Sequence, residues 1–240
     1  MATVNHVGLQ PRGRYFYFLI ALVLALIVFL GFARTFFLNS LFAKRDLSAL
    51  YMAHGIVFTS WILLFITQTW LVASDRIAVH RRLGVAGAVL AVLMIVVGLT
   101  IAIHAARYGF QTPGLPPPLI FFVVPFFDIL VFAILVGSAL YYRHTPATHK
   151  RLMLVAAISM LPPAIARIPL HFLAATLPIS AFAIADLILI GCVAYDFVVH
   201  RKLHRAFLWG GLLFIISFPL RMFLAGTAAW MAFAHWIAGV

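Results

Sequence analysis

The sequence is poor in charge and contains no glutamate. Of its 240 residues, 9% are charged and 65% are hydrophobic. Soluble domains carry about 25% charged residues, so this composition excludes a soluble globular domain. The single cysteine, Cys192, excludes an intramolecular disulfide and a metal site built from several cysteines. The acidic residues are all aspartates: Asp46, Asp75, Asp128, Asp186 and Asp196.

Long apolar runs take the place of the missing charge. A helix needs about 20 apolar residues to cross the hydrocarbon core of a bilayer. We therefore predict an all-α fold, a bundle of seven transmembrane helices in one domain that covers residues 1–240. The tail at 226–240 is too short to span, and its Trp230 and Trp236 predict a position at the membrane interface. The predicted spans are about 15–35, 52–73, 83–105, 119–142, 150–172, 179–199 and 205–225.

Lysine and arginine are concentrated in every second loop. A net charge of +12 would suggest a nucleic-acid partner in a soluble protein, but basic loops are the ordinary topological signal of a membrane protein, so we expect no nucleic acid. The positive-inside rule predicts a cytoplasmic N-terminus, an external C-terminus and anionic lipids at the cytoplasmic face of a bacterial inner membrane. The opposite loops carry only Lys44, Arg45 and Arg107. The predicted cytoplasmic residues are Arg12, Arg14, Arg76, Arg81, Arg82, Arg143, Lys150, Arg151, Arg201, Lys202 and Arg205.

A histidine with basic neighbours opens three of the predicted spans. The three motifs are His80-Arg81-Arg82, His149-Lys150-Arg151 and His204-Arg205. Each follows another span after a short polar turn, so the chain reads as three pseudo-repeated helical hairpins after a first helix. The last two hairpins also share an intramembrane aspartate and an arginine shortly after a proline, in Pro163…Arg167 and Pro219…Arg221.

Ionisable residues gather at the predicted outer third of the bundle. Such a group costs at least about 2.5–3.5 kcal/mol at membrane depth, so it should face the bundle interior and be paired. One interpretation is two structural ion pairs, Asp128–Arg167 and Asp186–Arg221. The other is an outward-facing polar cavity for an anionic substrate or a quinone, in which His54, Asp128 and Asp186 offer zinc or iron ligands. The group consists of Arg34, His54, Asp128, Arg167, His171, Asp186 and Arg221.

The histidines at the cytoplasmic boundary have two interpretations. In the first interpretation, they are interfacial residues that contact lipid phosphates together with their basic neighbours. Alternatively, His80, His149 and His204 ligate haem or form a three-histidine metal site, because adjacent cations favour the neutral imidazole that binds metals. The same cations would neutralise haem propionates.

Part of this pattern resembles a known family. His54-Gly55, Ser60-Trp61 and His80-Arg81 are similar to motifs of the transmembrane ascorbate-reducible cytochromes b. In that family, histidines near the starts of four successive helices hold two b haems and pair alternate helices. The resemblance implies that His80 and His149 hold the cytoplasmic-side haem and that His54 is one ligand of the other. The partner of His54 is missing, because Asp128 occupies that region of the fourth span.

A second likeness covers a shorter segment. Residues 148–153, Thr-His-Lys-Arg-Leu-Met, are similar to a helix start in small membrane proteins that assist cytochrome oxidase maturation. Three functions follow from the residues and are left open. They are a haem-binding redox or electron-transfer protein, a seven-helix metal-dependent lipid hydrolase, and a transporter or assembly factor without a cofactor.

Overall fold

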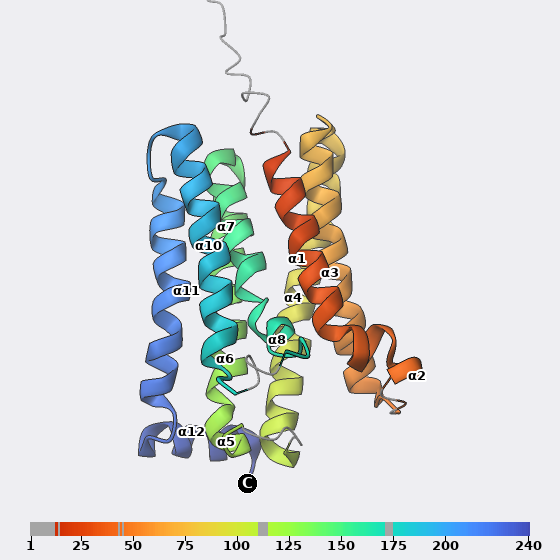
Figure 1. Cartoon of the computed structure of the whole chain (residues 1–240), viewed down its shortest axis with the longest axis vertical. Coiled ribbons are helices and arrows are strands. Elements are labelled where there is room, and N and C mark those ends of the chain that lie inside the picture. The colour runs from red at the N-terminus through yellow and green to blue at the C-terminus, as the bar shows by residue number, and fades with distance from the viewer. Residues whose placement is uncertain (1–12, 14, 43, 45, 110–114, 171–174) are drawn as a thin grey trace, which may run out of the picture.

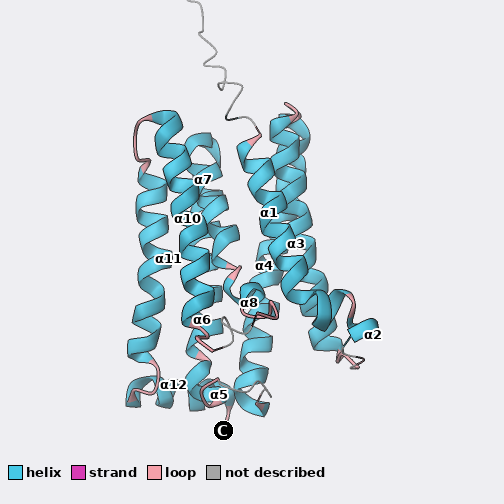
Figure 2. Cartoon of the chain, viewed as in Figure 1, coloured by secondary structure: helices cyan, strands magenta, loops and turns pink. Residues whose placement is uncertain are grey.

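The computed structural model describes residues 13, 15–42, 44, 46–109, 115–170 and 175–240, and all regular structure within them is helical (Figure 2). Arg12, Arg14, Arg45 and His171, which the sequence analysis named, lie outside the described residues. Six helical segments in the described part of the chain are long and apolar enough to cross a membrane. The chain is therefore an integral membrane protein.

The six segments agree closely with six of the predicted spans. They begin and end within a few residues of the predicted limits, and the largest difference is at the start of α4. Their elements are α1 (Phe16–Phe32) with the π-helix η2 (Ala33–Phe37), α3 (Ala49–Ala73), α4 (Ile77–Tyr108), α5 (Pro118–Phe121) with α6 (Val123–Tyr141) and the 3-10 helix η3 (Tyr142–His144), α10 (Ile179–His200) and α11 (Arg205–Leu224).

The remaining predicted span is broken. It consists of α7 (Pro146–Ser159) and α8 (Pro162–Ile165). Pro162 and Pro163 lack the amide hydrogens that would continue α7, so the helix is interrupted here. With 14 residues, α7 is about 21 Å long and shorter than the hydrocarbon core of about 30 Å. Within the described ranges, the predicted span at 150–172 corresponds to α7 and α8 together.

The long helices run in alternating directions along the chain (Figure 1). We call one end of the bundle the basic end, where the α3–α4, α6–α7 and α10–α11 turns lie, and the other the opposite end. The α6–α7 hairpin forms the centre of the bundle, and five α7 side chains, Leu152, Leu154, Val155, Ala156 and Ile158, are fully buried. The surrounding helices leave apolar side chains exposed, which is the surface that lipid requires.

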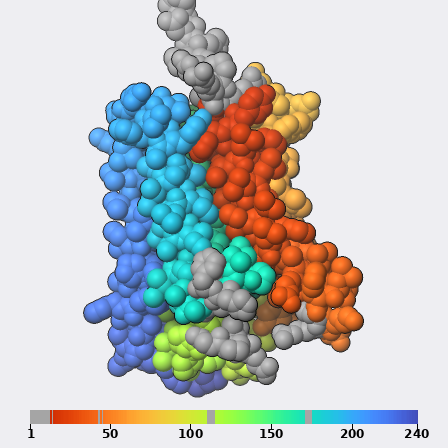
Figure 3. Space-filling model, viewed as in Figure 1, coloured from red at the N-terminus to blue at the C-terminus, as the bar shows by residue number. Residues whose placement is uncertain are grey.

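Close backbone contact joins α1 to α8. A Cβ atom added at Gly31 would lie 2.1 Å from the carbonyl oxygen of Ala164, so only glycine permits this approach. Near the basic end, Phe16 of α1 stacks on Tyr195 of α10 with ring centroids 3.9 Å apart, and the two helices share one face of the molecule (Figure 3). These contacts join the first helix to the later hairpins.

Two short helices lie at the opposite end. They are α2 (Asn39–Phe42) and α12 (Ala228–Ala238), and α12 lies across the ends of the long helices (Figure 1). Trp236 is 77% exposed, and its position at the membrane interface stays a prediction. Trp230 differs, because its ring is buried and its Nε1 donates a 3.0 Å hydrogen bond to the carbonyl of Leu119. Thus Trp230 anchors the tail to the bundle.

Candidate functional site

Two of the histidines from the repeated motif meet at the basic end. His80 lies in the first turn of α4 and His149 in the first turn of α7, and their ring centroids are 6.3 Å apart with planes inclined by 75°. Both side chains are half-buried. Two helices from different hairpins therefore bring together the pair that the cytochrome resemblance implies.

A hydrogen bond determines which nitrogen of His149 carries hydrogen. Its Nδ1 lies 2.8 Å from the carbonyl oxygen of Ala139. Because a carbonyl oxygen only accepts hydrogen bonds, Nδ1 is the donor, and the Nε2 of the neutral ring keeps its lone pair. Metal-binding histidines are commonly oriented by such a bond from the other ring nitrogen to a carbonyl group.

The neighbour of His80 is Gln68, a glutamine of α3. In the orientation that satisfies both neighbours, the Gln68 carboxamide donates to His80 Nδ1 over 2.5 Å and accepts from the backbone nitrogen of Gly84 over 3.0 Å. The hydroxyls of Ser60, Thr67 and Thr69 instead donate to carbonyl groups of their own helix. Gln68 thus links α3 to the His80 turn.

His204 has a different role from the other two histidines of the motif. It is the N-cap residue of α11, where its Nδ1 accepts a 3.1 Å hydrogen bond from the backbone nitrogen of Ala206. Within the described ranges, no three His, Cys, Asp or Glu side chains come close enough together to hold a metal ion. The predicted three-histidine group is therefore not brought together.

The cap makes the stability of α11 depend on pH. Partial burial lowers the pKa of His204 below about 6.5, Arg151, Lys150 and His200 act in the same direction, and Asp196 opposes them. The unfolded chain therefore binds this proton more tightly, so the stabilisation from the cap is complete above pH of about 6.5 and is lost as pH falls toward the folded pKa.

We expect the Tm of the protein in detergent to fall on acidification. In His204→Asn, which keeps a capping acceptor that does not titrate, the fall should be smaller. Equal pH slopes would contradict this role.

A fully buried ion pair lies toward the opposite end. The Nη1 of Arg221 on α11 donates to Oδ1 of Asp128 on α6, and Nη2 donates to the Ser217 hydroxyl over 3.0 Å. The guanidinium also lies 5.0 Å from the ring centroid of Phe182. Arg221 is 0% and Asp128 4% exposed. This arrangement satisfies the requirement that charge at membrane depth be paired.

The observed pairing corrects the predicted one. The repeat predicts the pairs Asp128–Arg167 and Asp186–Arg221, but α11 packs against α6 and brings Arg221 to Asp128. Arg167 follows the break at Pro162-Pro163 and donates to the Pro163 carbonyl over 2.7 Å. Its guanidinium lies toward α1, 4.9 Å from the centroid of the Phe32 ring. Helix adjacency, rather than position within a hairpin, selects the partner.

A second buried ion pair was missed by sequence reasoning. Arg151 of α7 binds Asp196 of α10 through two hydrogen bonds, Nε–Oδ2 at 3.0 Å and Nη2–Oδ1 at 2.7 Å. The Nη1 of Arg151 donates to the Ala147 carbonyl over 2.7 Å. Arg151 and Asp196 are each 3% exposed. In the sequence, Arg151 serves as one of the basic residues that indicate topology. The sequence feature that could have indicated this pair is Asp196, a carboxylate that lies about one turn before the predicted end of its span at the basic loop.

The other predicted polar residues remain apart. His54 on α3 packs against Phe58 with centroids 4.1 Å apart, and its Nδ1 has no hydrogen-bond partner in the described part. Asp186 on α10 is half-buried, and its Oδ1 likewise has no partner there. Arg34 is exposed beside the ring of Phe42. The metal set of His54, Asp128 and Asp186 is not assembled among these residues, and zinc or iron stays a prediction.

Comparisons with known proteins add no relative. No protein-family model matches the chain, and no curated protein and no solved structure matches it significantly. The candidate site therefore stands on its own residues, and the six apolar helices place the chain among integral membrane proteins.

Proposed function

We propose that this chain is a membrane b-type haem protein that transfers electrons, in which His80 and His149 would hold the haem iron. The observation that carries the proposal is the separation of the two imidazoles, 6.3 Å between centroids. Two imidazoles on opposite sides of one metal ion, each with a metal–nitrogen bond of about 2 Å, have centroids roughly 6 Å apart. The helices α4 and α7 thus hold the two rings at the spacing that such ligation needs.

The hydrogen-bond partners of the two rings suit this role to different degrees. The Ala139 carbonyl holds Nδ1–H of His149, so Nε2 is the free ligand atom. For His80 to bind through Nε2, its Nδ1 must carry the hydrogen. In the orientation that satisfies both of its neighbours, the Gln68 carboxamide donates to His80 Nδ1, so ligation through Nε2 would require this carboxamide to turn over and give up its hydrogen bond from the Gly84 backbone nitrogen. His149 thus has its orienting partner in place, and His80 would gain one by this turn.

The charge around the pair suits an anionic cofactor. Arg81 and Arg82 follow His80 directly and are exposed, and Lys150 follows His149. These cations would neutralise the propionate groups that haem carries. A haem held by two histidines supplies one-electron chemistry, and the surrounding protein tunes its potential through hydrogen bonds and burial. The described chain contributes ligands, orientation and charge balance.

The proposal includes the topology predicted from the sequence. In it, α7 and α8 together make the seventh crossing, the N-terminus is cytoplasmic, and the basic end lies at the cytoplasmic face of a bacterial inner membrane. The support is the concentration of Arg and Lys in the turns at this end. The metal-dependent lipid hydrolase, the cofactor-free transporter and the quinone or lipid substrates stay predictions.

The test is an absorption spectrum of the full chain produced with a haem supply. We expect a Soret band from the wild type and loss of the low-spin bis-histidine spectrum in His80→Ala and in His149→Ala. The matched control is His144→Ala, because His144 is an exposed histidine at the same end. A wild type that binds no haem on reconstitution overturns the proposal, as does a His149→Ala spectrum identical to that of the control.

A further inference from the structure

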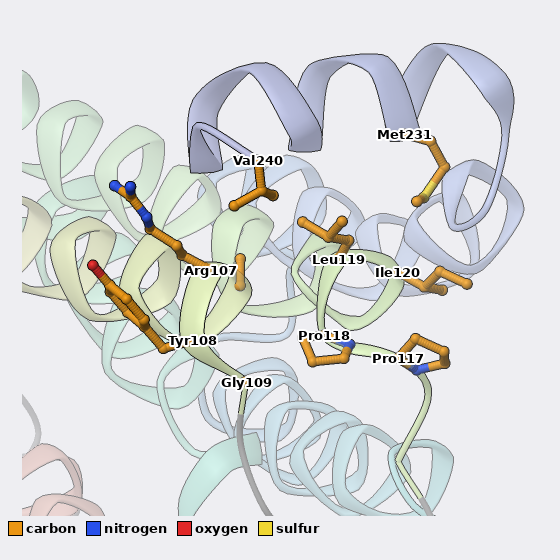
Figure 4. Close-up of a pocket in the computed structure, with 10 residues that line it drawn as sticks. Arg107, Tyr108, Gly109, Pro117, Pro118, Leu119, Ile120, Met231 and Val240 are labelled. Atoms are coloured by element: carbon orange, nitrogen blue, oxygen red, sulfur yellow. The ribbon is translucent and has the colours of Figure 1, made fainter.

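A pocket at the opposite end of the bundle has no part in the proposed haem site. It has a volume of about 440 Å³ and lies where the end of α4 meets α5 and α12. Figure 4 shows Arg107 and Tyr108 of α4 on one side, and Leu119 and Ile120 of α5 with Met231 of α12 on the other. Its walls are therefore basic and aromatic at one side and apolar at the other.

Contacts from α12 hold the walls in place. Besides its hydrogen bond to the Leu119 carbonyl, the Trp230 ring lies 5.6 Å from Phe122 and 5.4 Å from Phe233, measured between centroids. Thr227 caps the helix by accepting from the Trp230 backbone nitrogen over 3.2 Å. Because α12 lies across the ends of the long helices (Figure 1), the pocket that it lines is at this end of the bundle.

The pocket has one cation, Arg107, and Val240, the last residue of the given sequence, also lines it near Arg107 (Figure 4). Arg107 is exposed in the last turn of α4, and within the described ranges it forms no ion pair with a carboxylate. Its guanidinium lies 5.5 Å from the ring centroid of its neighbour Tyr108. A guanidinium matches the geometry of a phosphate group, to which it can donate two parallel hydrogen bonds.

We propose that this pocket binds one anionic phospholipid, with the lipid phosphate at Arg107 and an acyl chain along Leu119, Ile120 and Met231. A water-soluble anion would leave the apolar wall exposed to water. A zwitterionic lipid would bring its own cation to the arginine. An anionic phospholipid complements both walls, and the position at the end of the bundle gives it access.

The test uses the purified full chain after delipidation. Phosphatidylglycerol and phosphatidylcholine with identical acyl chains are compared by the rise in Tm and by lipid retention in native mass spectrometry. We expect one retained phosphatidylglycerol and a preference for it over phosphatidylcholine. Arg107→Gln should weaken phosphatidylglycerol binding about fivefold, the effect of one basic residue at an anionic membrane surface. Arg34→Gln is the control, because Arg34 is an exposed arginine at the same end that does not line the pocket.

A second variant and a third ligand keep the assignment testable. Ile120→Trp fills the apolar wall and keeps Arg107, so it should reduce the binding of both lipids. Glycerol phosphate, which has no acyl chain, should not raise the Tm at the lipid concentrations used. The proposal is overturned if glycerol phosphate stabilises as well as the lipid does. It also fails if Arg107→Gln keeps the full preference for phosphatidylglycerol, or if Arg34→Gln loses as much.

Discussion

Replacing Asp128 by alanine is expected to lower the free energy of unfolding by about 3–5 kcal/mol, because the substitution leaves the Arg221 guanidinium buried without a counter-charge. Arg221 is fully buried among Phe182, Ser217 and Val124, so water cannot replace the carboxylate without rearrangement of the helices. The measurement is unfolding of the detergent-solubilised protein by SDS titration, followed by circular dichroism.

The two partners of this pair are expected to differ. Arg221→Met should cost less than Asp128→Ala, because a carboxyl group can take up a proton and become neutral, whereas a guanidinium stays charged. The double variant Asp128→Leu/Arg221→Met removes both charges and should recover most of the loss. The control is Asp46→Ala, an exposed aspartate for which we expect a change within about 0.5 kcal/mol. Equal costs for the two single variants would contradict the explanation.

The second large effect is expected at Arg151 and Asp196. Asp196→Ala removes the acceptor of two guanidinium hydrogen bonds between α7 and α10, and the cost should again be about 3–5 kcal/mol. Asp196→Asn keeps one oxygen acceptor and should cost less. Because this pair joins two hairpins, its loss should also separate their unfolding transitions. Hydrogen exchange can measure this, with faster exchange in α10 than in α4.

Arg151 also connects stability to the proposed haem site. It lies two residues after His149 in the same helix, and its bonds to Asp196 hold α7 against α10. If His149 binds haem, Asp196→Ala should weaken haem binding without removing a ligand. Full haem affinity in a destabilised Asp196→Ala protein would show that the α4–α7 contact alone positions His149.

The helices themselves could be predicted because apolar length is a local property. A run of about 20 apolar residues must be helical in lipid, where every backbone hydrogen bond has to be made within the segment. The start of α4 was predicted too late, at 83 instead of Ile77, because a helix continues past the hydrocarbon core into the polar head-group region. His80 therefore lies inside the first turn of α4, where its ring meets His149.

The pairing of side chains could not be predicted from the same pattern. The repeat correctly marked Asp128 and Arg221 as residues that need partners, but it placed each partner within one hairpin. Nothing local in the chain shows that α6 lies beside α11 or that α7 lies beside α10. The Arg151–Asp196 pair was missed for this reason. Both residues lie near basic loops, where the topology already accounts for an arginine such as Arg151.

The sequence by itself determined that this protein is a helical membrane protein, the approximate limits of six of its long helices, and that Asp128 and Arg221 are too costly to leave unpaired at membrane depth. Those properties depend on composition and on the distance of a residue from the end of its apolar run. The tertiary structure decided that His80 faces His149, that His204 caps α11 and that Arg221 binds Asp128. These contacts join residues far apart in the chain, and only the packing of helices against one another brings them within bonding distance.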